Sequence, residues 1–265
     1  MAPSLVKRAL VRPFALLRLT SDWRSYREFM RMREAGAHTG EGESEVELHI
    51  GRLAGRPVVI REGTADVDTL WDVFIHRYHL PPAFVMRRGV HQIWDLGANV
   101  GLTMADMAVE FPDAKTIVGI ELDADNAALA RRNVEPWDDR AQVVHAAAWP
   151  DDGQTWYHRW PGGTSGYHVH PPTPGEEPQG PVVPTLSLNT VIAQTGGPVS
   201  YVKMDVEGAE RELLARNTEW AAQVSCIKVE VHGDYTVDDC VADLRRLGFA
   251  ARRDRRHKAA VLGVR

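Results

Sequence analysis

The strongest constraint on the fold is an alternation of apolar and amphipathic stretches that begins at residue 91. Strand-like apolar runs occupy residues 91–96, 116–122, 141–149, 199–206 and 226–232, and helices are expected after Asn99, Asp125, Glu207 and Thr236. Such alternation produces a parallel sheet with crossover helices. The last helix is expected to stop at Gly248, before two short strands joined by a tight turn. We therefore predict an α/β fold with a doubly wound, seven-stranded, mostly parallel sheet that ends in an antiparallel C-terminal hairpin.

The residues before this alternation predict an N-terminal extension. Residues 45–62 alternate apolar and polar side chains around Gly55, as a β-hairpin does. Residues 65–80 place apolar side chains on one face of a helix, which Pro81 and Pro82 end. We expect residues 1–63 to form a basic helical arm and a β-hairpin, and residues 64–265 to form the main domain.

Charge is unevenly distributed along the chain. The 265 residues carry 31 Lys and Arg against 36 Asp and Glu, and this net charge of -5 gives no reason to expect a nucleic-acid partner. Residues 1–35 nevertheless carry eight basic and three acidic side chains, a net charge of +5. We expect this arm to pack on the fold or to form a homodimer contact. Weak contact with an anionic membrane surface is the alternative.

The two cysteines, Cys226 and Cys240, are too few for a disulfide framework or a four-cysteine zinc site. This predicts a reducing compartment. The apolar stretch near the start is interrupted by Arg12, Pro13 and Arg18 and lacks a small-residue cleavage pattern, which argues against an export signal. We therefore expect a cytoplasmic protein.

One segment, residues 150–184, interrupts the alternation. It holds eight prolines and four aromatic residues, Trp156, Tyr157, Trp160 and Tyr167, beside His158, His168 and His170. A loop of this length inside a compact domain is usually functional or disordered. Planar side chains favour a substrate-contacting rim for a sugar or an aromatic group. A flap that packs only on itself is the alternative.

The sharpest motif is a strand that runs through a glycine turn into a helix, at residues 93–101. Gly97 allows a ligand to approach the backbone, Gly101 allows the helix to pack closely, and the helix start offers free N–H groups. The dinucleotide fingerprint G-x-G-x-x-G fails, because positions 99 and 102 are Asn99 and Leu102. An acidic residue two before the glycine, Asp95, with Asn two after it, is instead typical of S-adenosylmethionine (SAM) methyltransferases.

The next two strands extend this motif. Glu121 lies 24 residues after Gly97, a spacing at which a carboxylate can accept both ribose hydroxyls. Small residues around Ala147 leave room for adenine, and Trp149 is expected to cover it. His145 is either a core group or a base. We assign cofactor binding to Asp95, Gly97, Ala98, Asn99, Gly101, Glu121, Leu122 and Ala147.

Four segments, WDLGANVG, VGIELDADNAALARRNV, VPTLSLNTVI and YVKMDVEGAERELL, together resemble the FkbM-type SAM-dependent methyltransferases. The resemblance covers residues 60–232, and DVEGAE at residues 205–210 is its most specific part. It implies a Rossmann-like class I methyltransferase fold and methyl transfer to a hydroxyl of a sugar, glycan or polyketide-derived product. Asn189 departs from the pattern, which usually has Asp at this position.

Asp205 ends the strand next to the glycine-turn strand in the inferred sheet order, so its carboxylate is expected in the crevice. Glu230 and His232 are two residues apart on the following strand and share a face. These three residues are expected to form one cluster, either a general base for a hydroxyl or a site for Mg²⁺. Structural pairing of Glu230 with His232 is the alternative. For Glu210 we expect only a favourable interaction with a helix N-terminus.

The sequence as a whole predicts a SAM-dependent O-methyltransferase that acts on a saccharide or glycan hydroxyl, such as that of a bacterial polysaccharide or glycolipid. Catalytic roles are assigned to Asp205, Glu230 and His232, and more weakly to His145. The expected partner is a small-molecule or oligosaccharide acceptor. A polyketide acceptor, a nicotinamide-dependent oxidoreductase and an inert SAM-binding scaffold remain as alternatives.

Overall fold

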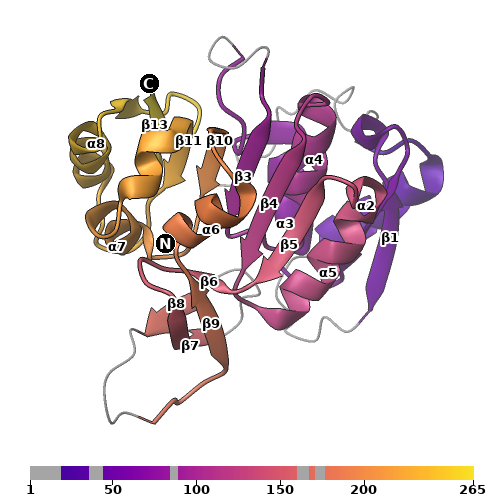
Figure 1. The fold of residues 1–265 in the computed structure, drawn as a ribbon. Coiled ribbons are helices and arrows are strands. Elements are labelled where there is room, and N and C mark those ends of the chain that lie inside the picture. Colours follow the sequence, from indigo (N-terminus) through magenta and orange to yellow (C-terminus); the bar gives the residue numbers. More distant parts are fainter. Residues whose placement is uncertain (1–18, 36–43, 84–88, 160–166, 171–176) are drawn as a thin grey trace.

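A computed structural model describes residues 19–35, 44–83, 89–159, 167–170 and 177–265. Its centre is a seven-stranded sheet with the order β12-β13-β11-β10-β3-β4-β5 (Figure 1). The strands are β3 (Gln92–Leu96), β4 (Thr116–Glu121), β5 (Ala141–His145), β10 (Val199–Met204), β11 (Val224–Glu230), β12 (Ala250–Arg253) and β13 (Ala260–Val264). Strands β3, β4, β5, β10 and β11 run parallel, whereas β13 is antiparallel to both of its neighbours. The predicted fold class is confirmed.

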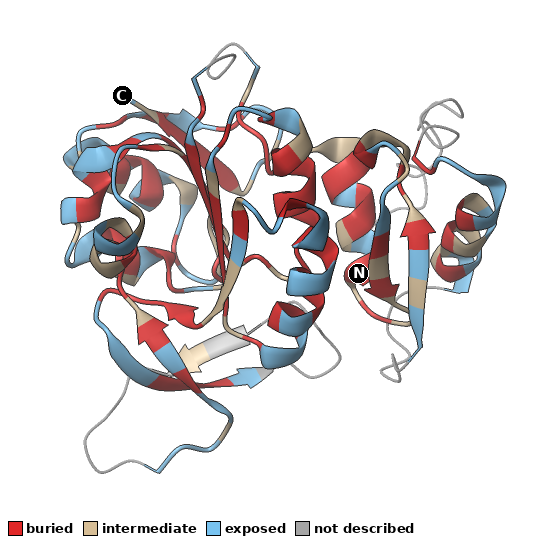
Figure 2. Ribbon diagram, turned by 45° about the vertical axis from the view of Figure 1, so that its right-hand side comes forward, coloured by how far each residue is buried: buried red, intermediate tan, exposed pale blue. Residues whose placement is uncertain are grey.

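Helices cover both faces of this sheet (Figure 2). They are α4 (Leu102–Glu110), α5 (Ala124–Val134), α6 (Leu188–Thr195), α7 (Glu210–Ala215) and α8 (Val237–Arg246), with short 3-10 turns η4 (Glu135–Trp137) and η5 (Glu219–Gln223). Successive residues of a strand face opposite sides, so Ile93 joins the core under α4 and α5 while Trp94 joins the core under α6, α7 and α8. Helix α7 begins three residues later than Glu207, because Glu207 has a left-handed φ of 56°.

The N-terminal extension packs against the main fold. It contains α2 (Trp23–Ala35), β1 (Glu45–His49), η2 (Gly51–Leu53) and β2 (Pro57–Arg61), and β1 and β2 form the predicted hairpin. Asn133 of α5 fixes the hairpin, since its side chain accepts from Val59 N–H at 2.7 Å and donates to Val59 O at 2.9 Å. Residues 1–18, most of the expected basic arm, lie outside the described residues.

The helix expected over residues 65–80 is shorter than predicted. It consists of α3 (Asp66–Trp71) and one π-helical turn, η3 (Asp72–His76), and it ends at Arg77 with a left-handed φ of 53°. A left-handed residue cannot continue a right-handed helix. Residues 77–80 therefore form a separate turn.

The described residues between 147 and 186 include a small four-stranded sheet, where the sequence suggested a long loop. Strands β6 (Ala147–Ala148), β9 (Val182–Leu186), β7 (Gly153–Arg159) and β8 (Tyr167–His170) pair in that order (Figure 1). The strand predicted over residues 141–149 breaks at Ala146, where the chain leaves the central sheet. Trp156 and Tyr157 are buried, and Tyr157 donates to Asp123 at 3.1 Å, so these two aromatic side chains do not form an exposed rim. Trp160 lies outside the described residues.

No helix among the residues described is long and apolar enough to cross a membrane. Both cysteines, Cys226 and Cys240, are buried and free.

Candidate active site

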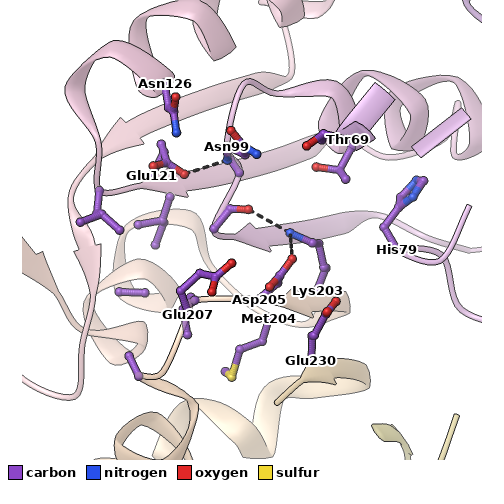
Figure 3. A pocket seen from close by; sticks show the side chains of 18 of the residues that line it. Thr69, His79, Asn99, Glu121, Asn126, Lys203, Met204, Asp205, Glu207 and Glu230 are labelled. Atoms are coloured by element: carbon purple, nitrogen blue, oxygen red, sulfur yellow. Dashed lines mark hydrogen bonds and ion pairs between the residues drawn. The ribbon is translucent and has the colours of Figure 1, made fainter. Parts of the chain in front are cut away.

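A cavity of about 380 Å³ opens at the carboxyl ends of the parallel strands (Figure 3). One side, the β4 end, is lined by Glu121, Leu122, Asn126, Ala146, Ala147 and Ala148. The opposite side, the β11 end, is lined by Tyr78, Asp205, Glu207, Lys228, Glu230 and His257. A third side, the α3 wall, is formed by Thr69, Asp72, Val73, His79, Leu102 and Thr103. Gly97, Ala98 and Asn99 lie between them. In parallel α/β sheets, ligands bind in such a crevice.

The glycine turn is held in contact with strand β10. Gly97 has a φ of 79°, and a Cβ at this position would lie 1.9 Å from the carbonyl oxygen of Asp205. Gly101, also with a φ of 79°, would bring a Cβ to 2.9 Å from Ala130 Cα on α5. The close approach of Gly97 leaves its backbone open to the cavity, whereas Gly101 serves helix packing and does not line the cavity.

Asp95 lies beneath this turn rather than on the cavity surface. Its side chain is fully buried, accepts a hydrogen bond from Thr103 Oγ1, and pairs with Lys203 Nζ at 3.1 Å. Asp95 therefore supports the glycine turn from below. Its place in the motif had suggested a direct contact with the cofactor.

Lys203 connects the glycine turn to the carboxylates of Asp95 and Asp205. Its ammonium group donates to Gly97 O at 2.9 Å and lies 3.4 Å from Asp205 Oδ2 (Figure 3). Burial lowers the pKa of Lys203, but the carboxylates of Asp95 and Asp205 outweigh burial and raise this pKa above its usual range. Sequence reasoning did not identify Lys203. Its only signal was a charged residue inside an apolar strand.

Glu121 is held by two backbone donors at the β4 end. Its Oε2 accepts from Asn99 N–H at 2.7 Å and its Oε1 accepts from Asp123 N–H at 2.9 Å. The side chain is 3% exposed, and burial raises the pKa of Glu121 to about 7 although both N–H donors lower it. Each carboxylate oxygen has a second lone pair for a ligand hydroxyl.

Other residues predicted near the cofactor divide into two groups. Ala98, Asn99, Leu122 and Ala147 line the cavity as expected. His145 does not line it, and its Nε2 instead bonds the carbonyl oxygen of Leu122 at 3.0 Å. Trp149 packs into the core under α6. His145 and Trp149 thus have structural contacts in place of the site contacts considered for them.

Asp205, Glu207 and His232 form one cluster at the β11 end. His232 Nε2 lies 3.5 Å from Asp205 Oδ1 and 3.7 Å from Glu207 Oε2. One potential ligand atom from each of these three residues lies within 4.8 Å of the others. His232 Nδ1 bonds Glu210 Oε1 at 2.8 Å. The geometry is compatible with a metal ion, and also with an imidazolium ring between carboxylates.

Glu210 has a larger role than a helix N-terminal charge. It is fully buried and accepts from Val206 N–H at 3.2 Å and from Gly208 N–H at 2.9 Å, in addition to holding His232. Glu210 therefore fixes both the loop that carries Glu207 and the orientation of the imidazole ring.

Glu230 stands apart from this cluster. It lines the cavity, but its carboxylate pairs with His257 Nδ1 at 3.4 Å rather than with His232. Among the described residues, the group with metal-ligand spacing contains Glu207 where the sequence suggested Glu230. Strand β11 ends at Glu230, two residues before His232, and the His232 ring bonds Glu210 at the start of α7.

The pKa values in this region are shifted by burial and by like charges. Burial raises the pKa of Glu230, and the Asp205 carboxylate adds to this. Burial likewise raises the pKa of Glu207 to about 7. Burial lowers the pKa of His232, but Glu210 and Asp205 outweigh it and raise the pKa well above that of a free imidazole. His232 is therefore protonated at neutral pH, whereas Glu207 and Glu230 are poised to gain or lose a proton.

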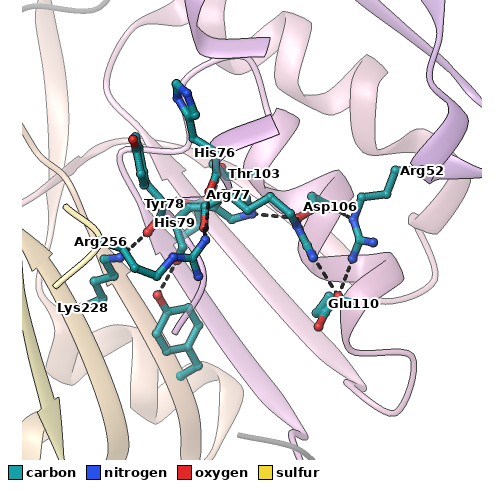
Figure 4. Close-up of polar contacts among 12 residues, drawn as sticks. Arg52, His76, Arg77, Tyr78, His79, Thr103, Asp106, Glu110, Lys228 and Arg256 are labelled. Carbon is teal, nitrogen blue, oxygen red and sulfur yellow. Dashed lines mark hydrogen bonds and ion pairs between the residues drawn. The ribbon is translucent and has the colours of Figure 1, made fainter. Parts of the chain in front are cut away.

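The remaining residues of the β11 end come from distant parts of the chain. The rings of Tyr78 and His257 stack at 5.1 Å. Lys228 pairs with Asp254 at 2.5 Å and donates to Tyr78 O, and Arg256 donates to His76 O at 2.8 Å (Figure 4). The polar run at residues 76–79 was the only available signal of these contacts.

Comparison with known proteins identifies the family. The family model described as methyltransferase FkbM domain matches residues 95–250, which include the glycine turn, Glu121 and the Asp205 cluster. The chain belongs to the FkbM methyltransferase family. This confirms the resemblance drawn from the sequence motifs. No curated protein sequence matches the chain.

Solved structures include distant neighbours of this FkbM-family chain. A methyltransferase FkbM from Methylobacillus flagellatus KT shares 15% identity over 74% of this chain and 54% of its own, with a TM-score of 0.49. This chain thus spans about half the length of that protein. A precorrin-6y C5,15-methyltransferase from Geobacter metallireducens shares 11% identity over 72% and 88%, with a TM-score of 0.44. The human METTL16 N-terminal domain, in complex with S-adenosylhomocysteine (SAH), shares 11% identity over 76% and 70%, with a TM-score of 0.39.

Proposed function

We propose that this FkbM-family methyltransferase uses SAM to methylate a hydroxyl group of a saccharide or glycan. The observation that carries the proposal is one cavity that joins a glycine turn and a buried ribose-type carboxylate to a cluster of acidic side chains. The turn at Gly97 leaves no room for a Cβ, and Glu121 stands at the β4 end. Asp205, Glu207 and Glu230 line the opposite end.

The residues at the β4 end fit the adenosine part of SAM. Glu121 accepts the ribose hydroxyls with the lone pairs that Asn99 N–H and Asp123 N–H leave free. Ala146, Ala147 and Ala148 form a side of small residues that would leave room for the adenine ring. When bound, SAM supplies the methyl group, which the acceptor oxygen takes as the carbon–sulfur bond breaks and SAH is released.

The β11 end supplies the proton chemistry. A hydroxyl is a poor nucleophile until its proton leaves, and general-base catalysis contributes typically ~10² to 10⁴ in rate. Glu230 lines the cavity, its pKa is raised by burial, and its Oε2 lies 3.4 Å from His257 Nδ1. We assign the base to Glu230. His232 carries a proton at neutral pH and holds Asp205 and Glu207 in place.

A divalent cation is a further component of the proposal. Metal-bound histidines usually donate their other ring N–H to a carboxylate or a carbonyl, and His232 makes such a hydrogen bond from Nδ1 to the buried Glu210. Mg²⁺ held by Asp205, Glu207 and His232 would replace the His232 proton and orient the acceptor diol.

The substrate class follows from the FkbM resemblance and from the polar character of the β11 end. Carboxylates suit the hydroxyl groups of a sugar better than an apolar ring system. A polyketide-type product remains the second candidate, since family resemblance includes it. We place the reaction in the cytoplasm, in keeping with two free buried cysteines and a small-molecule or oligosaccharide acceptor.

The test begins with calorimetric binding of SAM, SAH and NAD to the full chain, with Mg²⁺ and with EDTA. Micromolar binding of SAM and SAH that is lost in Glu121→Ala is expected, and binding of NAD alone would overturn the proposal. Transfer of labelled methyl from SAM is then measured on panels of methyl glycosides and of polyketide alcohols. Transfer to no hydroxyl by a chain that binds SAM would favour the scaffold interpretation.

A further inference from the structure

His79 is a buried titratable residue on the α3 wall that the proposed chemistry does not use. The residue lines the cavity and is only 7% exposed. Its Nε2 bonds Asp106 Oδ2 at 2.9 Å (Figure 4). Asp106 belongs to helix α4 and does not line the cavity. Nδ1 has no hydrogen-bond partner among the residues that the structure describes. A buried ring nitrogen without a partner needs an explanation.

The Asp106 contact determines which nitrogen of His79 carries the proton. Asp106 is fully buried and also accepts from Arg52 and from Arg77, at 2.9 Å for the Arg77 Nη2 atom. These cations keep the carboxylate ionised, so it can only accept a hydrogen bond, and His79 Nε2 must carry the proton that it donates. Burial lowers the pKa of His79, which keeps the ring neutral. Nδ1 is therefore a bare lone pair and accepts only a hydrogen-bond donor.

The position of His79 relative to the other parts of the cavity indicates which donor it receives. The β4 end holds adenosine in the proposed function, and the β11 end holds the acceptor hydroxyl. The amino-acid tail of SAM leaves the ribose on the side opposite adenine. If its methyl group met Asp205 and Glu230, the tail would lie against the α3 wall, the remaining side of the cavity.

We infer that His79 Nδ1 accepts a hydrogen bond from the α-ammonium group of the methionyl part of SAM or SAH. The assignment rests on the proposed function, because it takes SAM as the ligand. Asp106 acts as a positioning residue that holds the imidazole in the Nε2–H form. A neutral ring suits this role, since an imidazolium would repel the ammonium group.

A second acceptor on the same wall, Asp72, is the competing candidate. Its side chain is 56% exposed and already pairs with His76 Nδ1 at 2.6 Å. Exposure weakens an ion pair through solvent screening. His79, in contrast, is desolvated and has no other partner for Nδ1 among the described residues, so we assign the ammonium contact to His79.

The experiment compares two ligands that differ in the amino-acid tail. Binding of SAH and of 5′-methylthioadenosine, which lacks the tail, is measured by calorimetry for the wild type and for His79→Gln. Glutamine keeps an amide donor for Asp106, and with that hydrogen bond made its carbonyl oxygen does not occupy the position of Nδ1. SAH affinity is expected to fall about 10- to 100-fold, the range for one hydrogen bond to a charged group. Affinity for 5′-methylthioadenosine is expected to stay within about twofold.

Two controls keep the outcomes separate. His91→Ala, at an exposed histidine outside this cavity, should leave both affinities unchanged. SAH without its amino group should bind the wild type and His79→Gln equally. An unchanged SAH affinity in His79→Gln, an equal loss for both ligands, or a loss only in Asp72→Asn would each overturn the inference. Wild-type protein that binds neither SAM nor SAH would instead overturn the proposed function.

Discussion

The β4 end and the β11 end of the cavity face each other but are formed by different kinds of chemical group. At the β4 end, backbone N–H groups, three alanines and one carboxylate, Glu121, form the surface. At the β11 end the surface consists of charged and aromatic side chains, including Glu230 and His257. A surface of backbone and small residues fits one ligand of fixed shape. Long polar side chains can adopt different rotamers for different acceptors. We therefore expect substitutions to separate cofactor binding from turnover.

The largest effect is expected at Gly97. Gly97→Ala places a Cβ 1.9 Å from Asp205 O and moves the turn away from β10, so SAM binding should be lost and the melting temperature lowered. Gly196→Ala is the matched control. Gly196 also has a positive φ, of 74°, but a Cβ added there would meet no atom within 4 Å, so only the left-handed penalty of about 1 to 2 kcal/mol applies. Equal melting-temperature shifts in both variants would contradict the close contact.

Turnover should depend on Glu230 without any change in cofactor affinity. Glu230→Gln removes the proposed base, and kcat should fall by about 10² to 10⁴. The SAM dissociation constant, measured by calorimetry, should stay within about twofold. Glu212→Gln, at a partly exposed carboxylate on α7, serves as the control. A parallel loss of SAM affinity in Glu230→Gln would show that the two ends of the cavity are not separable.

Affinity at the β4 end should depend on Glu121. Glu121→Ala removes a charged acceptor for two ribose hydroxyls, and each such hydrogen bond contributes roughly 1.5 to 3 kcal/mol. Calorimetry should show SAM affinity weakened by at least about 100-fold. Full SAM affinity in this variant would refute the ribose assignment.

The same carboxylate predicts two opposite pH trends. The pKa of Glu121 in the folded chain is about 7, above its value of 4.5 in the unfolded chain. Burial of the neutral Glu121 carboxyl group therefore contributes to the free energy of unfolding. This contribution is fully present below pH 4.5 and is lost as the pH rises through 7. SAM affinity should instead rise between about pH 6 and 8, because the ionised form accepts the ribose hydroxyls. Calorimetry of wild type and Glu121→Ala across this range checks both trends, and a pH-independent difference between them would contradict the assignment.

The smallest effect is expected at His145. Its Nε2 contacts only a backbone carbonyl, that of Leu122, among the described residues, and His145 does not line the cavity. His145→Ala should change kcat less than about twofold, with a modest loss of stability. A large loss of turnover at unchanged SAM affinity would return His145 to the catalytic residues.

The sequence was sufficient for the central sheet and for most of the β4 end. Strand and helix patterns are local, and the Gly97 turn and Glu121 lie on adjacent strands within one short stretch of chain. Their spacing in the sequence was therefore enough to predict that they lie close together. The small sheet of β6, β7, β8 and β9 was missed, because the prolines of this segment, including Pro184 in the middle of β9, read as loop signals.

The β11 end was harder to predict because its contacts join residues far apart in sequence. Asp205 and His232 were identified from the strand ends. Glu207, rather than the predicted Glu230, lies near His232. This placement depends on the left-handed backbone of Glu207, which no sequence pattern indicated. The pairing of Glu230 with His257 requires the position of the β12–β13 turn, which only the folded chain supplies.

The contact between Arg256 and the carbonyl oxygen of His76 joins positions 180 residues apart. Lys228 makes a similar contact with Tyr78 O. During synthesis the N-terminal partner of each contact leaves the ribosome long before its C-terminal partner. The Gly97 turn gains its contact with Lys203, 106 residues further along the chain, before the β12–β13 turn has emerged. The β12–β13 turn, with Arg256 and His257, emerges later still, so the β11 end of the cavity is the later of the two to be completed during synthesis.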